Sequence, residues 1–269
     1  MFVDTHCHLD FKLFSGDLQD VISRAKNNGV EVFINPAIDL QSSLQCLAIT
    51  ESTSEIFAAI GVHPNEINVS TASEIINALS LCIGHKKLVA IGEIGLDYYH
   101  NLFDHELQKN IFSTQLELAI ENHLPVIIHS RDSIKEVLDL INRYYSKPGQ
   151  SNAFPHNGVI HAFEGDAEEA LQAVEYGFLI GVGGPVTYKN SLKKHNLVKM
   201  IPISSILLET DSPFLSPEPL RGTRNEPGNI KFIAEKIAKL KECDIKQVEI
   251  QTTSNARSLF NIGEEIDLN

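Results

Sequence analysis

Two histidines, His6 and His8, stand two residues apart in the segment DTHCHLD at residues 4–10. Alternate side chains of an extended strand point the same way, so both imidazoles can bind one metal ion. Cys7 then points to the opposite side, and we exclude it from the site although a thiolate binds zinc well. Taken alone, a histidine pair with this spacing is a weak indication of a metal site.

Four further metal-binding side chains end or follow other apolar runs: Glu93, His129, His161 and Asp211. A single histidine or carboxylate at such a place usually has a structural role, for example in a turn or a helix cap. The coincidence at five separate runs is what indicates a metal centre. The donors are nitrogen and oxygen, which suit magnesium, zinc or manganese and do not choose among them.

Six ligands are too many for one catalytic zinc ion, which usually takes three protein ligands and a water. They suit two divalent ions about 3.5 to 4 Å apart. We predict that Glu93 bridges the pair, because a carboxylate can bind two ions. The first ion is then bound by His6, His8, Glu93 and Asp211, and the second by His129, His161 and Glu93.

Such a centre has the chemistry of a hydrolase. Bound divalent ions lower the pKa of a water toward neutrality, and Asp211 is placed to accept its proton. The two ions carry four positive charges, while Glu93 and Asp211 carry two negative ones. The remaining positive charge favours an anionic substrate centre, such as a phosphodiester. We therefore predict Asp211 and Glu93 as the catalytic residues.

Eight short apolar runs, rich in β-branched residues, position these side chains. Most are continuous rather than alternating, which is typical of strands buried on both faces. Segments with helical periodicity lie between them, and this alternation predicts a parallel sheet. The predicted strands are 2–5, 31–35, 56–61, 88–93, 125–129, 158–162, 178–183 and 206–210, and the predicted helices are 17–28, 103–123, 131–145, 166–176 and 228–242.

Eight such strands predict an α/β fold that closes into one (β/α)8 TIM-type barrel, which typically needs about 250 residues. We expect residues 1–269 to form a single domain, with a last helix at 244–260 packed outside the barrel. In such barrels the active site lies at the C-terminal ends of the strands, where the six candidate ligands are predicted.

The composition limits the function classes and the compartment. The formal net charge of −13 argues against a broad basic surface that coats nucleic acid, although bound metal ions can reverse the sign locally. The four cysteines are scattered without a C-x-x-C pair, which fits a reducing, intracellular compartment. No apolar run is long enough to span a bilayer, and no signal peptide is evident. We expect a cytoplasmic protein, or a nuclear one in a eukaryote, with no membrane contact and no obligate protein partner.

Longer motifs resemble those of the TatD family of metal-dependent deoxyribonucleases, within the amidohydrolase-like barrels. They run almost from end to end: DTHCHLD at 4–10, GVHP at 61–64, GEIGLDYY at 92–99, PVIIHSRD at 125–132, GVIHAFEG at 158–165, LLETDSPFL at 207–215, PLRGTRNEPGN at 219–229 and NARSLFN at 255–261. The resemblance implies the TIM-type barrel and the same six metal ligands. It also implies hydrolysis of DNA, usually as a 3′-to-5′ exonuclease on single-stranded ends, with magnesium supporting activity.

The sequence departs from the family pattern after the sixth predicted strand. Residues 161–165 read HAFEG, where the family has a stretch similar to H-C-F-S-G. Glu164 therefore adds a negative charge near the site, which would weaken phosphate binding or change the preferred strand end.

Four residues are candidates for substrate contact: His63, Arg131, Arg221 and Arg224. His63 ends the third predicted strand on the same face of the barrel, and guanidinium groups suit phosphate oxygens. Each has a structural alternative. His63 would stabilise a turn, Arg131 would form a local salt bridge, and the other two would be solubilising or ion-paired surface arginines.

Two other functions stay open. Related barrels hydrolyse amides, lactones or phosphotriesters with similar metal sites, so a non-nucleic-acid ester, amide or lactone is an alternative substrate. A metal-binding scaffold within a partner complex is the other alternative, which the complete ligand set disfavours. A DNA substrate, single-stranded or with 3′ ends, is the leading prediction.

Overall fold

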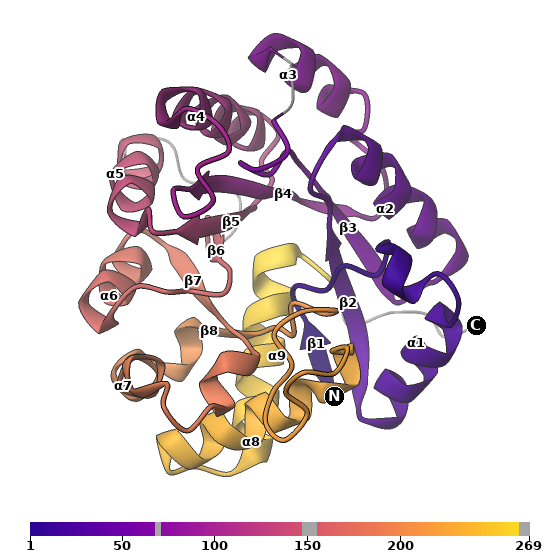
Figure 1. Ribbon diagram of the computed structural model, residues 1–269, viewed down its shortest axis with the longest axis vertical. Helices are drawn as coiled ribbons and strands as arrows, with labels where there is room; N and C mark the ends of the chain where they lie inside the picture. The colour runs from indigo at the N-terminus through magenta and orange to yellow at the C-terminus, as the bar shows by residue number, and fades with distance from the viewer. Residues whose placement is uncertain (68–70, 147–154, 264–269) are drawn as a thin grey trace.

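The computed structural model describes residues 1–67, 71–146 and 155–263, and in these residues eight parallel strands alternate with helices around a barrel (Figure 1). Each strand pairs with its sequence neighbours in the order β1 to β8. The strands are β1 (Phe2–Asp4), β2 (Val30–Pro36), β3 (Ile56–Ile60), β4 (Leu88–Asp97), β5 (Val126–Arg131), β6 (Gly158–Ile160), β7 (Phe178–Val182) and β8 (Ile206–Leu208). All eight lie where the sequence predicts them.

The first and last strands meet through their carboxyl ends. The backbone N–H of Thr5 donates to the carbonyl of Leu208 at 3.0 Å, and Cys7 forms a parallel bridge with Ser212. These contacts bring the chain after β8 against the chain after β1. The predicted (β/α)8 TIM-type barrel is therefore confirmed.

Helices surround the barrel on its outer face, as Figure 1 shows. Those that the sequence predicts are α1 (Leu18–Asn27), α4 (His105–Glu121), α5 (Ile134–Tyr145), α6 (Ala167–Glu175), α8 (Ile230–Lys241) and α9 (Ile245–Phe260). The structure adds α2 (Leu40–Ser52), α3 (Ala72–Ser80) and α7 (Leu192–Met200). In α7 only Leu197 and Val198 are buried, so this helix has little of the apolar periodicity by which helices are recognised in a sequence.

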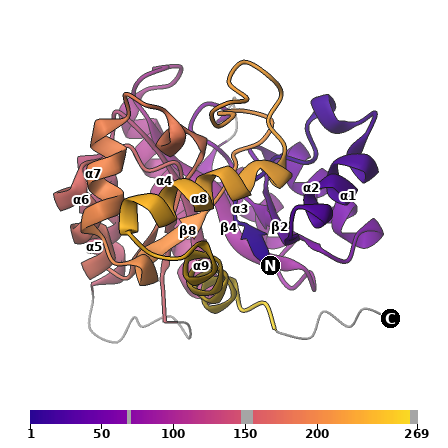
Figure 2. The ribbon, with the colours of Figure 1, turned by 90° about the horizontal axis from the view of Figure 1, so that it is seen from below.

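The predicted last helix, α9, lies outside the strands, where it closes one end of the barrel. Ala256, Leu259 and Phe260 of α9 belong to the same apolar core as the inward-facing Val3 and Val32. Figure 2 shows α9 at one end of the barrel, away from the loops that follow the strands. The helix thereby removes the apolar end of the barrel interior from water. This burial stabilises the position of α9 at the end of the barrel.

The fourth strand is longer than predicted, because β4 continues beyond Glu93 to Asp97. Its extra residues pair with β5, with Asp97 opposite Arg131. Glu93 therefore lies inside a fully buried strand, and two acidic residues of this strand face the carboxyl end of the barrel.

None of the helices in the described residues has the length and apolarity that crossing a membrane requires. The prediction of one domain over residues 1–269 includes residues 68–70, 147–154 and 264–269, which lie outside the described residues. That prediction stays untested.

Candidate metal centre

The structure brings all six predicted metal ligands together at the carboxyl ends of the strands. His6 and His8 follow β1, Glu93 lies in β4, His129 in β5, His161 follows β6 and Asp211 follows β8. Five of the six, all but His6, line one pocket of about 820 Å³. Cys7 points away, as predicted, and its thiol donates to the carbonyl of Ile34 at 3.5 Å.

Glu93 is the centre of this arrangement. Its Oε2 lies 3.3 Å from Nε2 of His6 and 3.7 Å from Nε2 of His8. Its Oε1 lies 3.0 Å from Nδ1 of His129 and 3.0 Å from Nε2 of His161. The two oxygens of one carboxylate thus face two groups of nitrogens, which is the geometry that a bridging ligand requires.

Asp211 belongs with the first group. Its Oδ1 lies 3.6 Å from Nε2 of His8 and 3.8 Å from Nε2 of His6. His161 lies between the groups, because its ring also stacks on that of His6 with centroids 3.8 Å apart. The predicted division of ligands therefore matches the geometry except at His161, which is near both groups.

Hydrogen bonds on the outer side of two rings fix which nitrogen faces the centre. Nδ1 of His8 donates to the carbonyl of Pro36 at 3.1 Å, which leaves the lone pair of Nε2 pointing inward. Nε2 of His129 lies 3.3 Å from Oδ2 of Asp97, which leaves the lone pair of Nδ1 for the centre. Histidine ligands of metals are commonly held by a carbonyl or a carboxylate in this way.

The donor set fits divalent cations. The Nε2 atoms of His6 and His8 are only 3.2 Å apart and both face the carboxylate of Glu93. Basic nitrogens and carboxylates repel one another when they converge without protons, and a shared cation removes that repulsion. The donor atoms form three groups, and within each group all atoms lie within 4.8 Å of one another, which is the spacing that a metal site requires.

Both carboxylates of the centre are held in the ionised form. Burial raises the pKa of Glu93, but the charges of His161 and His6 lower it further, to well below its usual range. Burial likewise raises the pKa of Asp211, and the hydrogen bond from His8 with the charge of His161 more than offsets this. Ionised carboxylates are the form that binds a metal.

His63 follows β3 and faces the same centre, with Nε2 3.5 Å from Oε1 of Glu93. The backbone N–H of Asn65 donates to Nδ1 of His63 at 3.1 Å, so Nε2 carries the proton of the neutral ring. Burial, then the charge of His129, lowers the pKa of His63 to about 3. His63 therefore presents a neutral N–H donor to the pocket, which suits contact with a substrate better than metal ligation.

The three candidate arginines differ in their position relative to the pocket. Arg131 lines the pocket, donates to Glu164 at 2.6 Å and lies over the ring of Tyr99 with 4.8 Å to its centroid. Arg221 is exposed and lies over the ring of Tyr188, outside the pocket lining.

Arg224 also lies outside the pocket. Its guanidinium donates to Asp17 and Glu226, at 2.7 Å and 2.8 Å, and to the carbonyl of Leu13. The structure thus brings His63 and Arg131 to the pocket and leaves the other two arginines outside it.

Three residues around the centre were not among the predicted site residues. Asp97 orients His129; it lies at the end of β4, in the motif GEIGLDYY that also contains Glu93. Glu209 is fully buried beside His161 and accepts from the backbone N–H of Ala162 at 2.5 Å, while burial raises its pKa to about 7. Lys194 of α7 lines the pocket, and it belongs to none of the sequence motifs quoted above.

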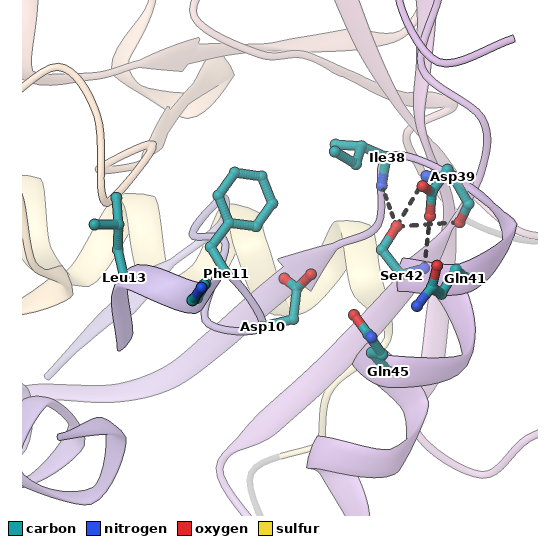
Figure 3. Close-up of a pocket in the computed structure, with 9 residues that line it drawn as sticks. Asp10, Phe11, Leu13, Ile38, Asp39, Gln41, Ser42 and Gln45 are labelled. Atoms are coloured by element: carbon teal, nitrogen blue, oxygen red, sulfur yellow. Dashed lines mark hydrogen bonds between the residues drawn. The ribbon is translucent and has the colours of Figure 1, made fainter. Parts of the chain in front are cut away.

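A second, shallower groove of about 430 Å³ adjoins the pocket and shares Phe11 and Ile38 with it. Figure 3 shows Asp10 and Phe11 on one side of this groove and Asp39 with Ser42 on the other. Its lining contains two carboxylates and one lysine. The residues that line the groove include none of the six predicted metal ligands.

The chain is similar to known proteins over nearly its whole length. Residues 3–261 match the family described as TatD related DNase. YabD of Bacillus subtilis, named as a metal-dependent hydrolase, is 40% identical over 265 residues, covering 98% of this chain and all of that protein. The crystal structure of YjjV, a TatD homologue from Escherichia coli, superimposes with a TM-score of 0.90 at 32% identity, covering 97% of this chain and 98% of that one. A TatD family hydrolase from Entamoeba histolytica gives a TM-score of 0.81 at 26% identity, covering 96% and 97% of the two chains.

Proposed function

Because the chain belongs to the TatD-related DNase family of metal-dependent hydrolases, we propose that it hydrolyses phosphodiester bonds of DNA, removing nucleotides from single-stranded 3′ ends. The centre takes two divalent ions in this proposal, with Glu93 as the bridge and Mg²⁺ as the ion of the active enzyme; Zn²⁺ and Mn²⁺ are alternatives. DNA is the partner, and no membrane or obligate protein partner is involved.

One observation carries the choice of a nucleic acid over a neutral ester or amide. The pocket beside the metal ligands combines cationic side chains with exposed aromatic rings at its mouth. Tyr99 is 60% exposed and Phe214 47% exposed, and both line the pocket. Exposed rings of this kind suit stacking with the bases of a single strand, and cations suit its phosphates.

In the proposed reaction, the metal ions, Asp211 and His63 each have a separate role. Bound divalent ions supply charge stabilisation and a water of lowered pKa. Asp211, which stays ionised, accepts a proton from the attacking water. His63 donates its Nε2–H to a non-bridging phosphate oxygen and strengthens this bond as negative charge develops there. Asp97 holds the ring of His129, and Glu209 lies 3.9 Å from Nδ1 of His161; neither carboxylate touches the substrate in this scheme.

A 5′-labelled single-stranded oligonucleotide tests the proposal. With purified protein and Mg²⁺ we expect a ladder of products shortened from the 3′ end, abolished by EDTA and restored by adding the metal. An oligonucleotide with a blocked 3′ end is the matched control and stays intact. If neither DNA is shortened while a small ester, lactone or amide is turned over at the same metal loading, the alternative substrate class replaces DNA. No turnover of any substrate with any metal indicates a metal-binding scaffold.

A further inference from the structure

Lys194 is a cationic side chain in the wall of the pocket that the proposed function has not yet used. It lies in the first turn of α7 and is partly buried. Its Nζ donates to the backbone carbonyl of Phe163 at 2.8 Å, and the side chain lines the same pocket as Glu93 and Asp211. The remaining two N–H groups of the ammonium have no partner within the described residues.

The other cation of the pocket lining is already paired. Arg131 donates to Glu164, whereas Lys194 forms no ion pair with any carboxylate in the described part of the chain. Burial lowers the pKa of Lys194, although the charges of Glu164 and Glu209 oppose this effect. A partly desolvated ammonium with free N–H groups gains more from a bound anion than an exposed lysine does.

Lys194 and His63 face the metal centre from opposite sides. His63 follows β3, and α7 follows β7, which lies four strands away in the closed order of eight. A phosphate at the metal centre and beside His63 therefore leaves Lys194 free for a group farther along the substrate. Gly183, Pro185 and Glu164 line the pocket together with Lys194, and Arg131 neutralises the carboxylate of Glu164, so Lys194 is the cation that stays available to an anionic group.

We propose that Lys194 binds a second phosphate of the substrate, next to the phosphodiester at the metal centre, and so favours substrates with at least two phosphates. The proposal deepens the proposed DNA hydrolysis and rests on it. It makes Lys194 a specificity-determining residue, with an effect on substrate affinity rather than on the chemical step.

Two nucleotides that a phosphodiesterase does not cleave make the test independent of turnover. Thymidine 3′,5′-bisphosphate carries two phosphates, and thymidine 5′-monophosphate carries one. Their binding to the metal-loaded protein is measured by calorimetry for the wild type, Lys194→Gln and Lys194→Arg. Glutamine keeps an N–H for the carbonyl of Phe163 but removes the charge, while arginine keeps both. Lys193→Gln is the matched control, because Lys193 is exposed on the same helix.

We expect Lys194→Gln to weaken binding of the bisphosphate by about 10-fold or more, the range of a charge-assisted hydrogen bond, with little change for the monophosphate. Lys194→Arg should restore most of the affinity, and Lys193→Gln should change neither ligand. Equal weakening of both ligands, or no change for either, overturns the proposal. Failure of the proposed function is seen separately, as wild-type protein that binds the bisphosphate through Lys194 but does not shorten the oligonucleotide.

Discussion

Nε2 of His129 lies 3.3 Å from Oδ2 of Asp97, on the side of the ring that faces away from the metal centre. Asp97 is itself fixed by hydrogen bonds from the side chain of Asn65 and the backbone of His100, at 2.7 Å and 2.9 Å. A buried carboxylate thus orients a metal ligand without approaching the metal, and it selects the tautomer in which Nδ1 can bind.

From this relationship we predict that Asp97→Asn weakens metal binding without removing a ligand. Loss of such an orienting carboxylate typically costs about 10- to 100-fold in metal affinity or activity. Metal titration of the apo-protein gives the affinity, and activity at saturating metal should recover most of the loss. Glu164→Gln, a loss of carboxylate charge elsewhere in the pocket, serves as the comparison. An unchanged metal affinity in Asp97→Asn would refute the orienting role.

A second prediction concerns Asp211 as proton acceptor. Asp211→Asn keeps the size of the side chain but removes its basic oxygen, so kcat on DNA should fall by at least ~10²-fold. Circular dichroism and thermal unfolding should show an intact fold, because the barrel core does not include this side chain. Turnover close to that of the wild type would exclude the role.

The sequence predicts the barrel and the ligand set for one physical reason. Strands buried on both faces are continuous apolar runs, and the residues after parallel strands converge at one end. Glu93, His129 and Asp211 could therefore be placed together without coordinates. Residues 40–52 form a helix that was not predicted. Its buried face includes Ser42, Ser43 and Thr50 and is not an apolar stripe, although a capping box at Asp39 marks its start.

Other features depend on contacts between segments far apart in the chain. The tautomer of His63 follows from a backbone N–H two residues later, whose direction is set by the turn after β3. Lys194 reaches the pocket only because α7 packs beside the loop that contains Phe163. Arg224, predicted from its chemistry as a phosphate ligand, is instead bound by Asp17, which lies more than two hundred residues earlier. Residue type alone does not contain this information.

Metal binding should release protons near neutral pH. In the metal-free protein, burial lowers the pKa of His8, but its hydrogen bond with Asp211 and the charge of Glu93 raise it to about 9. Burial also lowers the pKa of His129, and its bonds with Asp97 and Glu93 raise it to about 9. Metal ions bind the neutral ring, so protons compete with the metal below this pKa.

The apparent metal affinity is therefore expected to rise from pH 7 to pH 9 and then to level off. Calorimetry in two buffers of different ionisation enthalpy measures the number of protons released. A binding heat that is the same in both buffers at pH 7 would show that the rings are already neutral in the apo-protein.

Arg221 should affect substrate binding and not stability. It is exposed on the loop after β8, where its guanidinium lies 4.3 Å from the centroid of the Tyr188 ring. We predict that Arg221→Ala raises KM for a DNA oligonucleotide more than it lowers kcat, as expected for a group that binds ground state and transition state alike. A dinucleotide too short to extend beyond the pocket provides the control, and its KM should not change. An unchanged KM for the oligonucleotide would assign Arg221 to the solvated surface.

Arg224 should affect stability and not substrate binding, because its guanidinium is bound to Asp17 and Glu226. Arg224→Ala is predicted to lower Tm by a few degrees at pH 7 and to leave KM unchanged. Hydrogen bonds from Arg224 and, to a smaller extent, from Arg24 lower the pKa of Asp17 from 3.8 to about 2 in the folded protein. A depressed carboxyl pKa contributes stability above the unfolded value, and this contribution is lost as the pH falls through the folded value. The difference in Tm between wild type and variant should therefore shrink as the pH falls from 3.8 toward 2, and a constant difference across this range would mean that the Asp17 ion pair does not cause it.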